Sequence, residues 1–277
     1  MTGPRLVVVI PSWSPDRALA LIRNLRTDYA TERYLVVGCA RPLSITDLEW
    51  AATDWIETRL PLSPVEAMAL GAQKAARRWG YDVLAFLHDD VQLDFYPESW
   101  NADIYGLLYE RSRCGLLGFG GSLGFATDDI YRAPYDYRQL ARVDFISNMR
   151  EAESHGRRVR VATQVAALDG FSLVVTREFY EASGGWESCL RDGVPFHMYD
   201  AWISCRAAEL GFETWMLPLR CHHEGGQTSV TMQERYAEVV RRLGYASAED
   251  LYAKGHKAVY KRFVSVLPIR LPRGERK

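Results

Sequence analysis

Short apolar runs alternate with helical stretches over the first ninety residues, and this alternation constrains the fold more than any other feature. The apolar runs cover residues 6–10, 34–37 and 83–87 and are rich in Val and Leu. Continuous runs of this kind are typical of strands that are buried on both faces of a sheet. Residues 19–25 carry apolar side chains at helical spacing, which predicts a helix after the first strand.

The clearest helix start in the chain lies between the second and third runs. Ser63 stands at an N-cap position, Pro64 at the first helical position and Glu66 three residues after the cap, which together form a capping box. Apolar side chains recur at helical spacing up to Trp79, and Gly80 ends the predicted helix. Strand, helix, strand, helix and strand with short links predict a parallel, doubly wound sheet, in which ligands bind at the carboxyl ends of the strands.

The rest of the chain carries further apolar runs and helical stretches, with one irregular segment between them. Residues 125–160 are rich in Tyr, Asp and Arg and follow no regular pattern, which predicts a surface insertion. We predict strands at residues 116–121, 165–168, 171–175 and 212–219, and helices at residues 199–210, 232–243 and 248–263.

The length of 277 residues is within the range of one large α/β domain with an extension. We predict the domain over residues 1–230, with a first half at residues 1–115 and a second half at residues 116–230 that contains the insertion 125–160. Residues 231–277 are predicted to form a C-terminal helical extension and a basic tail.

The charge balance argues against a protein that binds nucleic acid or anionic membrane over its whole surface, because the formal net charge is only −1. The last segment differs, since residues 254–277 hold eight Lys and Arg against the single acid Glu275. This segment is either a solvated tail or a patch for a polyanionic acceptor or a membrane surface.

The five cysteines are scattered and lack a CxxC pair, which predicts reduced, buried thiols rather than a disulfide framework or a zinc knuckle. The apolar run at residues 6–10 is too short for a signal peptide. No apolar stretch approaches the roughly 18 residues that a membrane span needs. We therefore expect a soluble, cytoplasmic protein.

Two carboxylates follow the third apolar run, in the sequence His88-Asp89-Asp90. Carboxylates at the open end of a buried strand are costly unless a cation meets them, and a hard divalent ion that also holds a diphosphate would do so. Side chains alternate along an extended chain, so we expect His88 and Asp90 to face one side and Asp89 the other. Asp90 is then the better metal ligand. The alternative is an Asp-Asp pair that merely caps or forms a loop.

Further candidates for the same site lie in the second half of the chain. His222 and His223 follow the predicted strand 212–219, and adjacent residues of an extended chain cannot both point inward, so only one of them is a metal ligand. Asp200 opens the predicted helix 199–210, where a carboxylate is electrostatically favoured. A structural pair of histidines and a helix-capping acid are the alternative interpretations.

These motifs occur in a series that resembles a known family. The series consists of residues 86–91, 169–171, 196–200, 211–212 and 222–226, in this order. It resembles the family-2-like, inverting glycosyltransferases of the GT-A type, in the variant with His-Asp-Asp in place of the Asp-x-Asp metal motif. The resemblance covers residues 5–230 and implies a GT-A (Rossmann-like) α/β fold: a mixed, mainly parallel sheet flanked by helices, with C-terminal helices.

The resemblance also implies an activity. Members of this family transfer a sugar from a nucleotide-diphosphate sugar to an acceptor hydroxyl, so residues 1–115 would bind the nucleotide sugar and residues 116–230 the acceptor of a hexosyl- or similar transferase. Asp90 matches the last acid of the metal motif and would bind Mn²⁺ or Mg²⁺ on the diphosphate, where the ion acts as a Lewis acid. Asp200 matches the acid that serves as general base.

Other positions match the family around the metal, the donor and the acceptor. His222 matches the later metal-binding histidine, with His223 as the alternative. The remaining matches are Pro11, Ser12 and Trp13 at the nucleobase, where Trp13 would stack, and Asp169 and Gly170 at the sugar and acceptor.

Two positions depart from the family pattern. His88 stands in place of the first acid of the metal motif, so a carboxylate contact to the ribose is not implied, and His88 and Asp89 are candidates for donor contacts. Cys39, Ala40 and Arg41 stand where an acid often reads the base. Arg41 is either a contact to phosphate or base, or a solvated side chain.

Other functions are open on the residues alone. A nucleotidyltransferase usually has a glycine- and basic-rich loop after the first strand, which residues 11–15 do not offer. A His-Asp phosphohydrolase builds its site on helices, whereas His88 follows a predicted strand. A non-catalytic nucleotide- or sugar-binding module is a further alternative. The acceptor is a saccharide or, through the basic C-terminus, a modified nucleic-acid base.

Overall fold

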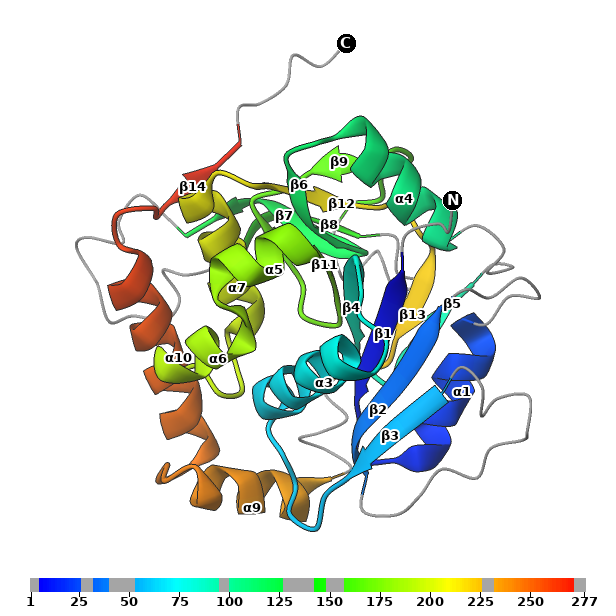
Figure 1. Cartoon of the computed structure of the whole chain (residues 1–277). Coiled ribbons are helices and arrows are strands. Elements are labelled where there is room, and N and C mark those ends of the chain that lie inside the picture. Colours follow the sequence, from blue (N-terminus) through cyan, green and yellow to red (C-terminus); the bar gives the residue numbers. More distant parts are fainter. Residues whose placement is uncertain are drawn as a thin grey trace.

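An eight-stranded mixed sheet forms the centre of the molecule (Figure 1). The computed structural model describes residues 5–25, 32–39, 53–94, 100–126, 142–147, 157–225 and 232–271. In their order across the sheet, the strands are β3 (Thr53–Glu57), β2 (Arg33–Cys39), β1 (Leu6–Pro11), β4 (Val83–Leu87), β11 (Ser172–Thr176), β6 (Cys114–Gly118), β12 (Glu213–Met216) and β9 (Thr163–Gln164). Four of the seven neighbouring pairs are parallel, so the sheet is mixed and mainly parallel, as predicted.

The first half of the sheet is the parallel arrangement predicted from the apolar runs. β1 pairs with β2 on one side and with β4 on the other, and both pairs are parallel. β3 adds a further parallel strand beside β2. The sequence did not predict β3, because Asp54 and Glu57 interrupt its apolar pattern. The carboxyl ends of β1 and β4 therefore lie next to each other at one edge of the sheet.

The second half departs from a simple parallel sheet. β11, predicted at residues 171–175, runs antiparallel between β4 and β6. The predicted strand at 116–121 is two strands, β6 in the main sheet and β7 (Gly120–Phe125) in a second sheet, with Phe119 at the bend. Gly118 lets the chain pass close to β11, since a Cβ at this position would lie 2.6 Å from the carbonyl oxygen of Ser172.

Helices cover both faces of the main sheet. Val7 and Val9 of β1 pack on one face with α3 (Pro64–Arg78), α5 (Arg177–Ser183), α6 (Gly185–Arg191) and α7 (Tyr199–Leu210). Val8 and Ile10 pack on the opposite face with α1 (Pro15–Leu25) and α4 (Trp100–Glu110). Successive residues of β1 thus pack into the cores on opposite faces of the sheet. Because both faces of the strand are buried, its residues form a continuous apolar run.

The predicted capping box is present at the start of α3. The Ser63 hydroxyl accepts a hydrogen bond from the Glu66 backbone N–H, and the Ser63 backbone N–H donates to Glu66 Oε2 at 2.7 Å. A cap of this kind stabilises a helix by about 1 kcal/mol. Arg242 also donates to the Glu66 carboxylate, at 2.7 Å to Oε1, and so ties the C-terminal region to α3. The Glu66 carboxylate therefore caps α3 and also anchors Arg242 near the C-terminus.

A second sheet joins the irregular segment to the end of the chain. β7 pairs with β8 (Arg142–Ser147), β10 (Ala167–Leu168) and β14 (Ile269–Arg270). Within the segment 125–160, which we expected to be irregular, residues 142–147 are thus a paired strand. The C-terminal helices α9 (Gln233–Arg242) and α10 (Ala248–Phe263) precede β14. In Figure 1, α10 runs beside α6 and α7, whereas α9 lies below α3.

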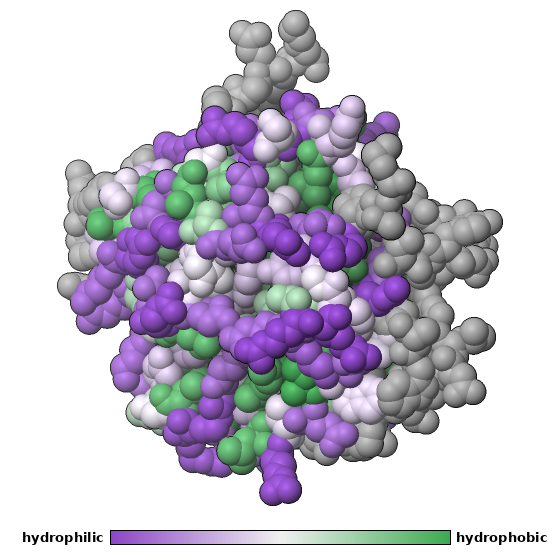
Figure 2. Space-filling view, in the orientation of Figure 1, coloured by the Kyte–Doolittle hydropathy of each residue, from purple (hydrophilic) through white to green (hydrophobic). Residues whose placement is uncertain are grey.

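The cysteines and the surface agree with the composition. All five cysteines are buried and none forms a disulfide bond, as predicted. The face shown in Figure 2 is mostly hydrophilic, with apolar side chains in small separate patches. Within the described ranges, no helix combines the length and the apolar character that a membrane crossing requires.

Candidate active site

The candidate site lies where β4 ends. The backbone N–H of His88 continues the sheet by donating to the carbonyl of Phe171 at 3.0 Å, and residues 89–90 then turn into the short strand β5 (Val91–Leu93). β13 (Cys221–His223) pairs antiparallel with β5 and places His223 opposite Val91. The turn and the strand pair therefore bring residue 223 next to residue 90, although they are far apart in the sequence.

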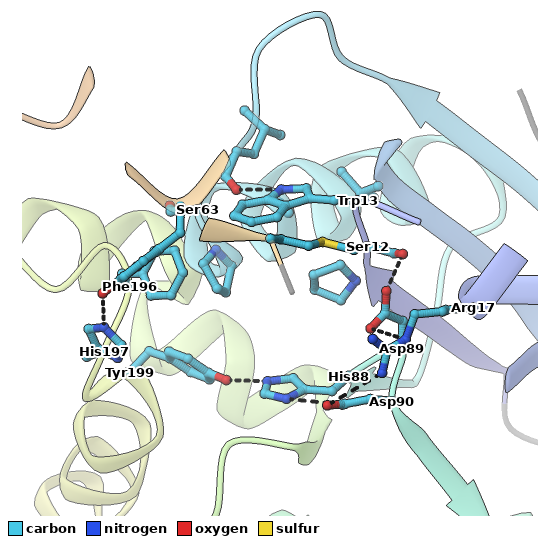
Figure 3. A pocket seen from close by; sticks show the side chains of 17 residues that line it. Ser12, Trp13, Arg17, Ser63, His88, Asp89, Asp90, Phe196, His197 and Tyr199 are labelled. Carbon is cyan, nitrogen blue, oxygen red and sulfur yellow. Dashed lines mark hydrogen bonds and ion pairs between the residues drawn. The ribbon is translucent and has the colours of Figure 1, made fainter. Parts of the chain in front are cut away.

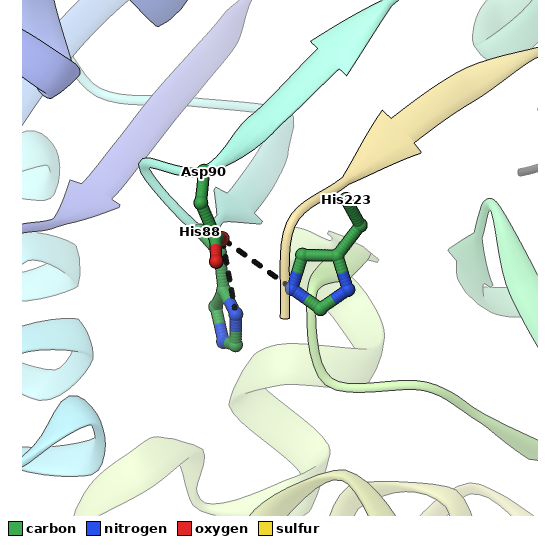
Figure 4. A group of neighbouring side chains, drawn as sticks. All are labelled: His88, Asp90 and His223. Atoms are coloured by element: carbon green, nitrogen blue, oxygen red, sulfur yellow. Dashed lines mark ion pairs between the residues drawn. The ribbon is translucent and has the colours of Figure 1, made fainter. Parts of the chain in front are cut away.

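Three side chains converge at this point (Figure 4). The Oδ1 atom of Asp90 lies 3.8 Å from Nδ1 of His88 and 3.3 Å from Nε2 of His223. One ligand atom from each of the three residues lies within 4.8 Å of the other two, a spacing at which they could hold one metal ion. Asp90 Oδ1 is also a buried oxygen without a well-formed hydrogen bond. A bound cation would satisfy this oxygen.

The charges of the cluster suit a cation. Burial by itself raises the pKa of Asp90, but the neighbouring His223, His88 and Arg17 lower it to about 2, so the carboxylate is ionised at neutral pH. Burial lowers the pKa of His88, so its imidazole is neutral there and has a lone pair to offer. An ionised carboxylate beside a neutral imidazole is the protonation state that metal binding requires.

Asp89 does not belong to the group of His88, Asp90 and His223, although it lines the same cleft. Its Oδ2 accepts a hydrogen bond from the Ser12 hydroxyl at 2.5 Å. Burial raises the pKa of Asp89 to about 6, against the opposing effects of Ser12 and Arg17. Asp89 thus connects the end of β4 to the loop after β1 through a hydrogen bond, while Asp90 lies next to His88 and His223.

Arg17 is a site residue that the sequence analysis did not predict. It lies in the first turn of α1, with Nη2 2.9 Å from the Glu224 carboxylate and 3.9 Å from Asp90, and with Nε 3.8 Å from Asp89. Its position shortly after the end of β1 was the available signal, because that loop borders the carboxyl end of the sheet. Arg17 is the cation that faces the acids from the side of α1.

A cleft of about 290 Å³ extends from these charged groups (Figure 3). Pro11, Ser12, His88, Asp89 and Asp90 all line it. Its other end has aromatic and aliphatic walls, formed by Trp13, Val37, Leu62, Phe196, His197 and Tyr236. A charged end that continues into an aromatic end is a shape that suits a nucleotide.

The aromatic walls are held by hydrogen bonds of their own. Trp13 Nε1 donates to the carbonyl of Leu62 at 3.1 Å, and Arg235 donates to the carbonyl of Trp13 at 2.8 Å. His197 Nε2 lies 2.7 Å from the hydroxyl of Tyr236. Arg235 and Tyr236 belong to α9, so this helix forms part of the aromatic wall.

Asp200 and the turn at residues 169–170 lie beside this cleft and are joined to each other. The backbone N–H of Gly170 donates to Asp200 Oδ2 at 3.2 Å, and Asp200 Oδ1 accepts from the N–H of Ala201 at 2.7 Å. Asp169 and Asp200 are both close enough to His88 to act electrostatically on its ring. Tyr199, rather than either acid, lines the cleft at this point.

Three predicted positions differ from expectation or lie outside the described residues. We expected His222 ahead of His223 as the metal-site histidine, but the pairing of β13 with β5 brings His223 to Asp90 and aligns His222 with Gln92. His88, expected at the donor, instead belongs to the group that could hold a metal. Arg41 lies outside the described residues.

Comparisons with known proteins give structural matches but no sequence matches. No family model and no curated protein sequence matches the chain. Among solved structures, GalNAc-T7 with UDP, GalNAc and Mn²⁺ is similar with a TM-score of 0.54 at 16% identity, over 86% of this chain and 48% of that one. This chain thus spans about half the length of GalNAc-T7.

Two other similar structures have lower TM-scores. The mannosyltransferase PcManGT from Pyrobaculum calidifontis, in complex with GDP-Man and Mn²⁺, matches with a TM-score of 0.45 at 14% identity, over 95% of this chain and 74% of that one. A197 from STIV matches with a TM-score of 0.41 at 13% identity, over 79% of this chain and 85% of that one. At 16% identity, the similarity to GalNAc-T7 concerns the fold alone. The mixed, mainly parallel sheet flanked by helices matches the fold of GT-A glycosyltransferase structures, as predicted.

Proposed function

We propose that this protein transfers a sugar from a nucleotide-diphosphate sugar to an acceptor hydroxyl, with a divalent metal ion at His88, Asp90 and His223. The observation that carries the proposal is the convergence of these three side chains beside a nucleotide-sized cleft at the carboxyl end of β4. In open α/β sheets this edge is where ligands bind. The similar GalNAc-T7 structure contains UDP and Mn²⁺.

The donor set favours Mn²⁺ over Mg²⁺. Two imidazole nitrogens and one carboxylate oxygen are offered, whereas Mg²⁺ prefers oxygen ligands and keeps much of its water. When bound, the ion supplies Lewis-acid stabilisation of the departing diphosphate. Arg17 is a second cation beside Asp89 and Asp90, and we propose that it contacts the diphosphate from the side of α1.

The remaining parts of the donor and acceptor are assigned by position. Trp13 lines the aromatic end of the cleft, where its indole is available to stack on the base, and Pro11 and Ser12 line the cleft between Trp13 and the charged end. Asp169 and Gly170 border the sugar and acceptor. Asp200 is the proposed general base for in-line attack, which would invert the anomeric configuration.

We propose a saccharide acceptor rather than a nucleic acid. Some of the basic side chains near the C-terminus are already paired with acids: Lys254 lies 2.7 Å from Asp250, and Arg262 lies 2.8 Å from Glu209 and 3.4 Å from Asp192. Paired charges release few counterions, so acceptor binding should depend little on salt. A steep loss of acceptor binding between low and moderate salt would favour nucleic acid instead.

A donor screen tests the central proposal. Thermal unfolding of the full chain would be followed with UDP- and GDP-sugars, with Mn²⁺ or Mg²⁺, and with a chelator. We expect one nucleotide sugar to raise the midpoint in the presence of Mn²⁺, because a ligand that binds only the folded state stabilises it. Asp90→Ala is the control and should remove the metal-dependent part. No shift with any donor, together with no effect of chelator, would refute the proposal.

Asp200→Asn separates binding from chemistry. The substitution keeps the size of the side chain but removes the base, so transfer should fall by about 10²- to 10⁴-fold while donor binding is kept. Transfer would be measured as release of nucleoside diphosphate with acceptor present, and donor binding by calorimetry. If donor binding is lost as well, Asp200 has a structural role at Gly170 instead of a catalytic one.

A further inference from the structure

The hydroxyl of Tyr199 makes two polar contacts beside the candidate metal site, of which the one to His88 is drawn in Figure 3. It lies 2.6 Å from Nε2 of His88 and donates to the carbonyl oxygen of Gly170 at 3.2 Å. Tyr199 is the first residue of α7 and is only 7% exposed. The metal site and the start of the helix that carries Asp200 are therefore connected through one phenol.

The number of protons available decides how these contacts are made. A carbonyl oxygen can only accept, and a phenol has a single proton to donate. Both contacts are satisfied only if Tyr199 donates to Gly170 and accepts from His88 Nε2–H. The neutral His88 ring then carries its proton on Nε2 and presents a bare Nδ1.

The bare nitrogen is the one that faces Asp90. Nδ1 of His88 lies 3.8 Å from Asp90 Oδ1, so an imidazole lone pair and a carboxylate oxygen face each other across a gap too long for a hydrogen bond. Two electron-rich atoms in this arrangement repel each other unless a cation lies between them. The opposite tautomer would turn an N–H toward the same space and block an ion.

The surroundings hold the phenol in place. Gly170 leaves room for it, since a Cβ at this position would lie 2.6 Å from the Tyr199 hydroxyl. Met198 has a φ of +67°, which is uncommon for a residue with a side chain and sets the direction in which Tyr199 enters the site. The ring of Trp186 packs edge-on against Tyr199 at 6.0 Å.

We infer that Tyr199 is a positioning residue that fixes His88 in its metal-binding tautomer by accepting its Nε2–H. The inference rests on the proposed function, because the ion concerned is the one assigned there to His88, Asp90 and His223. Partners of this kind, which hold the second nitrogen of a ligating histidine, set its orientation and its basicity. The signal in the sequence was only a tyrosine beside Asp200, which is why it was not predicted.

Binding of Mn²⁺ without nucleotide tests the inference, in two variants that carry the same Tyr-to-Phe substitution at different positions. Tyr199→Phe removes the hydroxyl that lies 2.6 Å from His88, and Tyr236→Phe removes a hydroxyl that lies 2.7 Å from His197 in the same cleft. Mn²⁺ titrations of the full chain by electron paramagnetic resonance should give an affinity about 10- to 100-fold lower for Tyr199→Phe. Tyr236→Phe should bind Mn²⁺ like the unaltered protein.

A second measurement uses the unaltered protein and does not depend on how a variant folds. Nitrogen-15 spectra of labelled histidine, assigned with His88→Gln, report which ring nitrogen carries the proton. We expect the Nε2–H form for His88 and a mixture of forms in Tyr199→Phe. An Nδ1–H form in the unaltered protein would overturn the inference, and so would unchanged Mn²⁺ affinity in Tyr199→Phe. If the unaltered protein binds no Mn²⁺ at all, the metal site of the proposed function fails instead.

Discussion

The two ends of the cleft differ in how well their polar groups are satisfied. At the charged end, Asp90 Oδ1 is buried without a well-formed hydrogen bond, and the pKa of Asp89 is raised to about 6 by burial. At the aromatic end, Trp13 Nε1 donates to Leu62 and His197 lies 2.7 Å from the Tyr236 hydroxyl. The charged end therefore has a polar atom that lacks a good partner, whereas the polar groups named at the aromatic end are hydrogen-bonded within the protein.

This difference indicates what each end contributes. Groups that are unsatisfied in the folded chain but positioned by it are typical of binding sites, where the ligand completes them. A packed, hydrogen-bonded wall contributes to the stability of the fold and to the shape of the cleft. Substitutions at the charged end should therefore change ligand binding, and substitutions at the aromatic end should mainly change stability.

The largest effect is expected from Phe196→Ala at the aromatic end. Phe196 is 6% exposed and belongs to a core cluster with Val239, Val240 and Leu251. Removing a buried phenyl ring costs about 3 kcal/mol or more of unfolding free energy. Urea unfolding would measure it, with Tyr109→Ala, which removes a 93% exposed ring, as the control without effect. A large change in Mn²⁺ affinity, with little loss of stability, would contradict the comparison.

Asp90→Asn should show the reverse pattern. The substitution removes the carboxylate from a site where the other two ligand candidates are histidines, so Mn²⁺ affinity should fall by more than about 100-fold, beyond the change expected for a residue that only supports a ligand. The lowered pKa of Asp90 means that its charge stabilises the metal-free fold, so the free energy of unfolding without metal should fall by at most about 2 kcal/mol, less than for Phe196→Ala. Mn²⁺ titration and urea unfolding on the same sample give both numbers, and unaltered Mn²⁺ binding would exclude Asp90 as a ligand.

His256, in α10, connects to the aromatic end of the cleft and makes the stability of the protein depend on pH. Its ring lies 4.4 Å from Tyr252, which in turn contacts His197 at 5.3 Å. Burial lowers the pKa of His256 from 6.5 to about 4. The unfolded chain therefore binds more protons at this residue between these values, so stability falls as pH decreases from about 6.5 to about 4.

His256→Leu should remove this contribution. Between pH 7 and pH 5, the unaltered protein should lose about 2 kcal/mol more unfolding free energy than the variant. Urea unfolding at both pH values measures the difference. Equal losses in the two proteins would mean that His256 is protonated as readily in the folded chain as in the unfolded one.

Trp13→Leu should give the smallest effect and would sharpen the comparison, because Trp13 is the part of the aromatic end assigned to the base. Loss of stacking should weaken binding of a nucleoside diphosphate by about tenfold. Affinity for Mn²⁺ alone should stay the same. If nucleotide affinity is also unchanged, the base binds elsewhere and the aromatic end has only a structural role.

Much of the fold was predictable because it is encoded locally. The capping box at Ser63 and the apolar runs of β1 and β4 act over a few residues, and the bounds predicted for α7 agree with the structure. β3 escaped prediction because its half-buried pattern contains acids. Local sequence patterns therefore predict the helices and strands that position the site. They do not predict which strands pair with one another.

The site was predictable only in part, for the same reason. Asp90 was proposed as a metal ligand because the segment His88-Asp89-Asp90 directly follows a buried strand. Alternation showed that only one of His222 and His223 can face the site, but the choice depends on the register of β13 against β5, which no local pattern contains. Arg17 and Tyr199 act through contacts with distant residues, at Glu224 and His88 respectively.

The pairing of β5 with β13 involves only three residues on each strand. A slip of one residue would turn His223 away from Asp90, because side chains alternate between the faces of a strand. An ion that binds only the aligned form therefore selects that alignment, by a free energy equal to its own binding free energy under the same conditions. A metal ion at the proposed site would therefore stabilise this strand pair in its observed register, and the order of the ligand set would in turn depend on the ion.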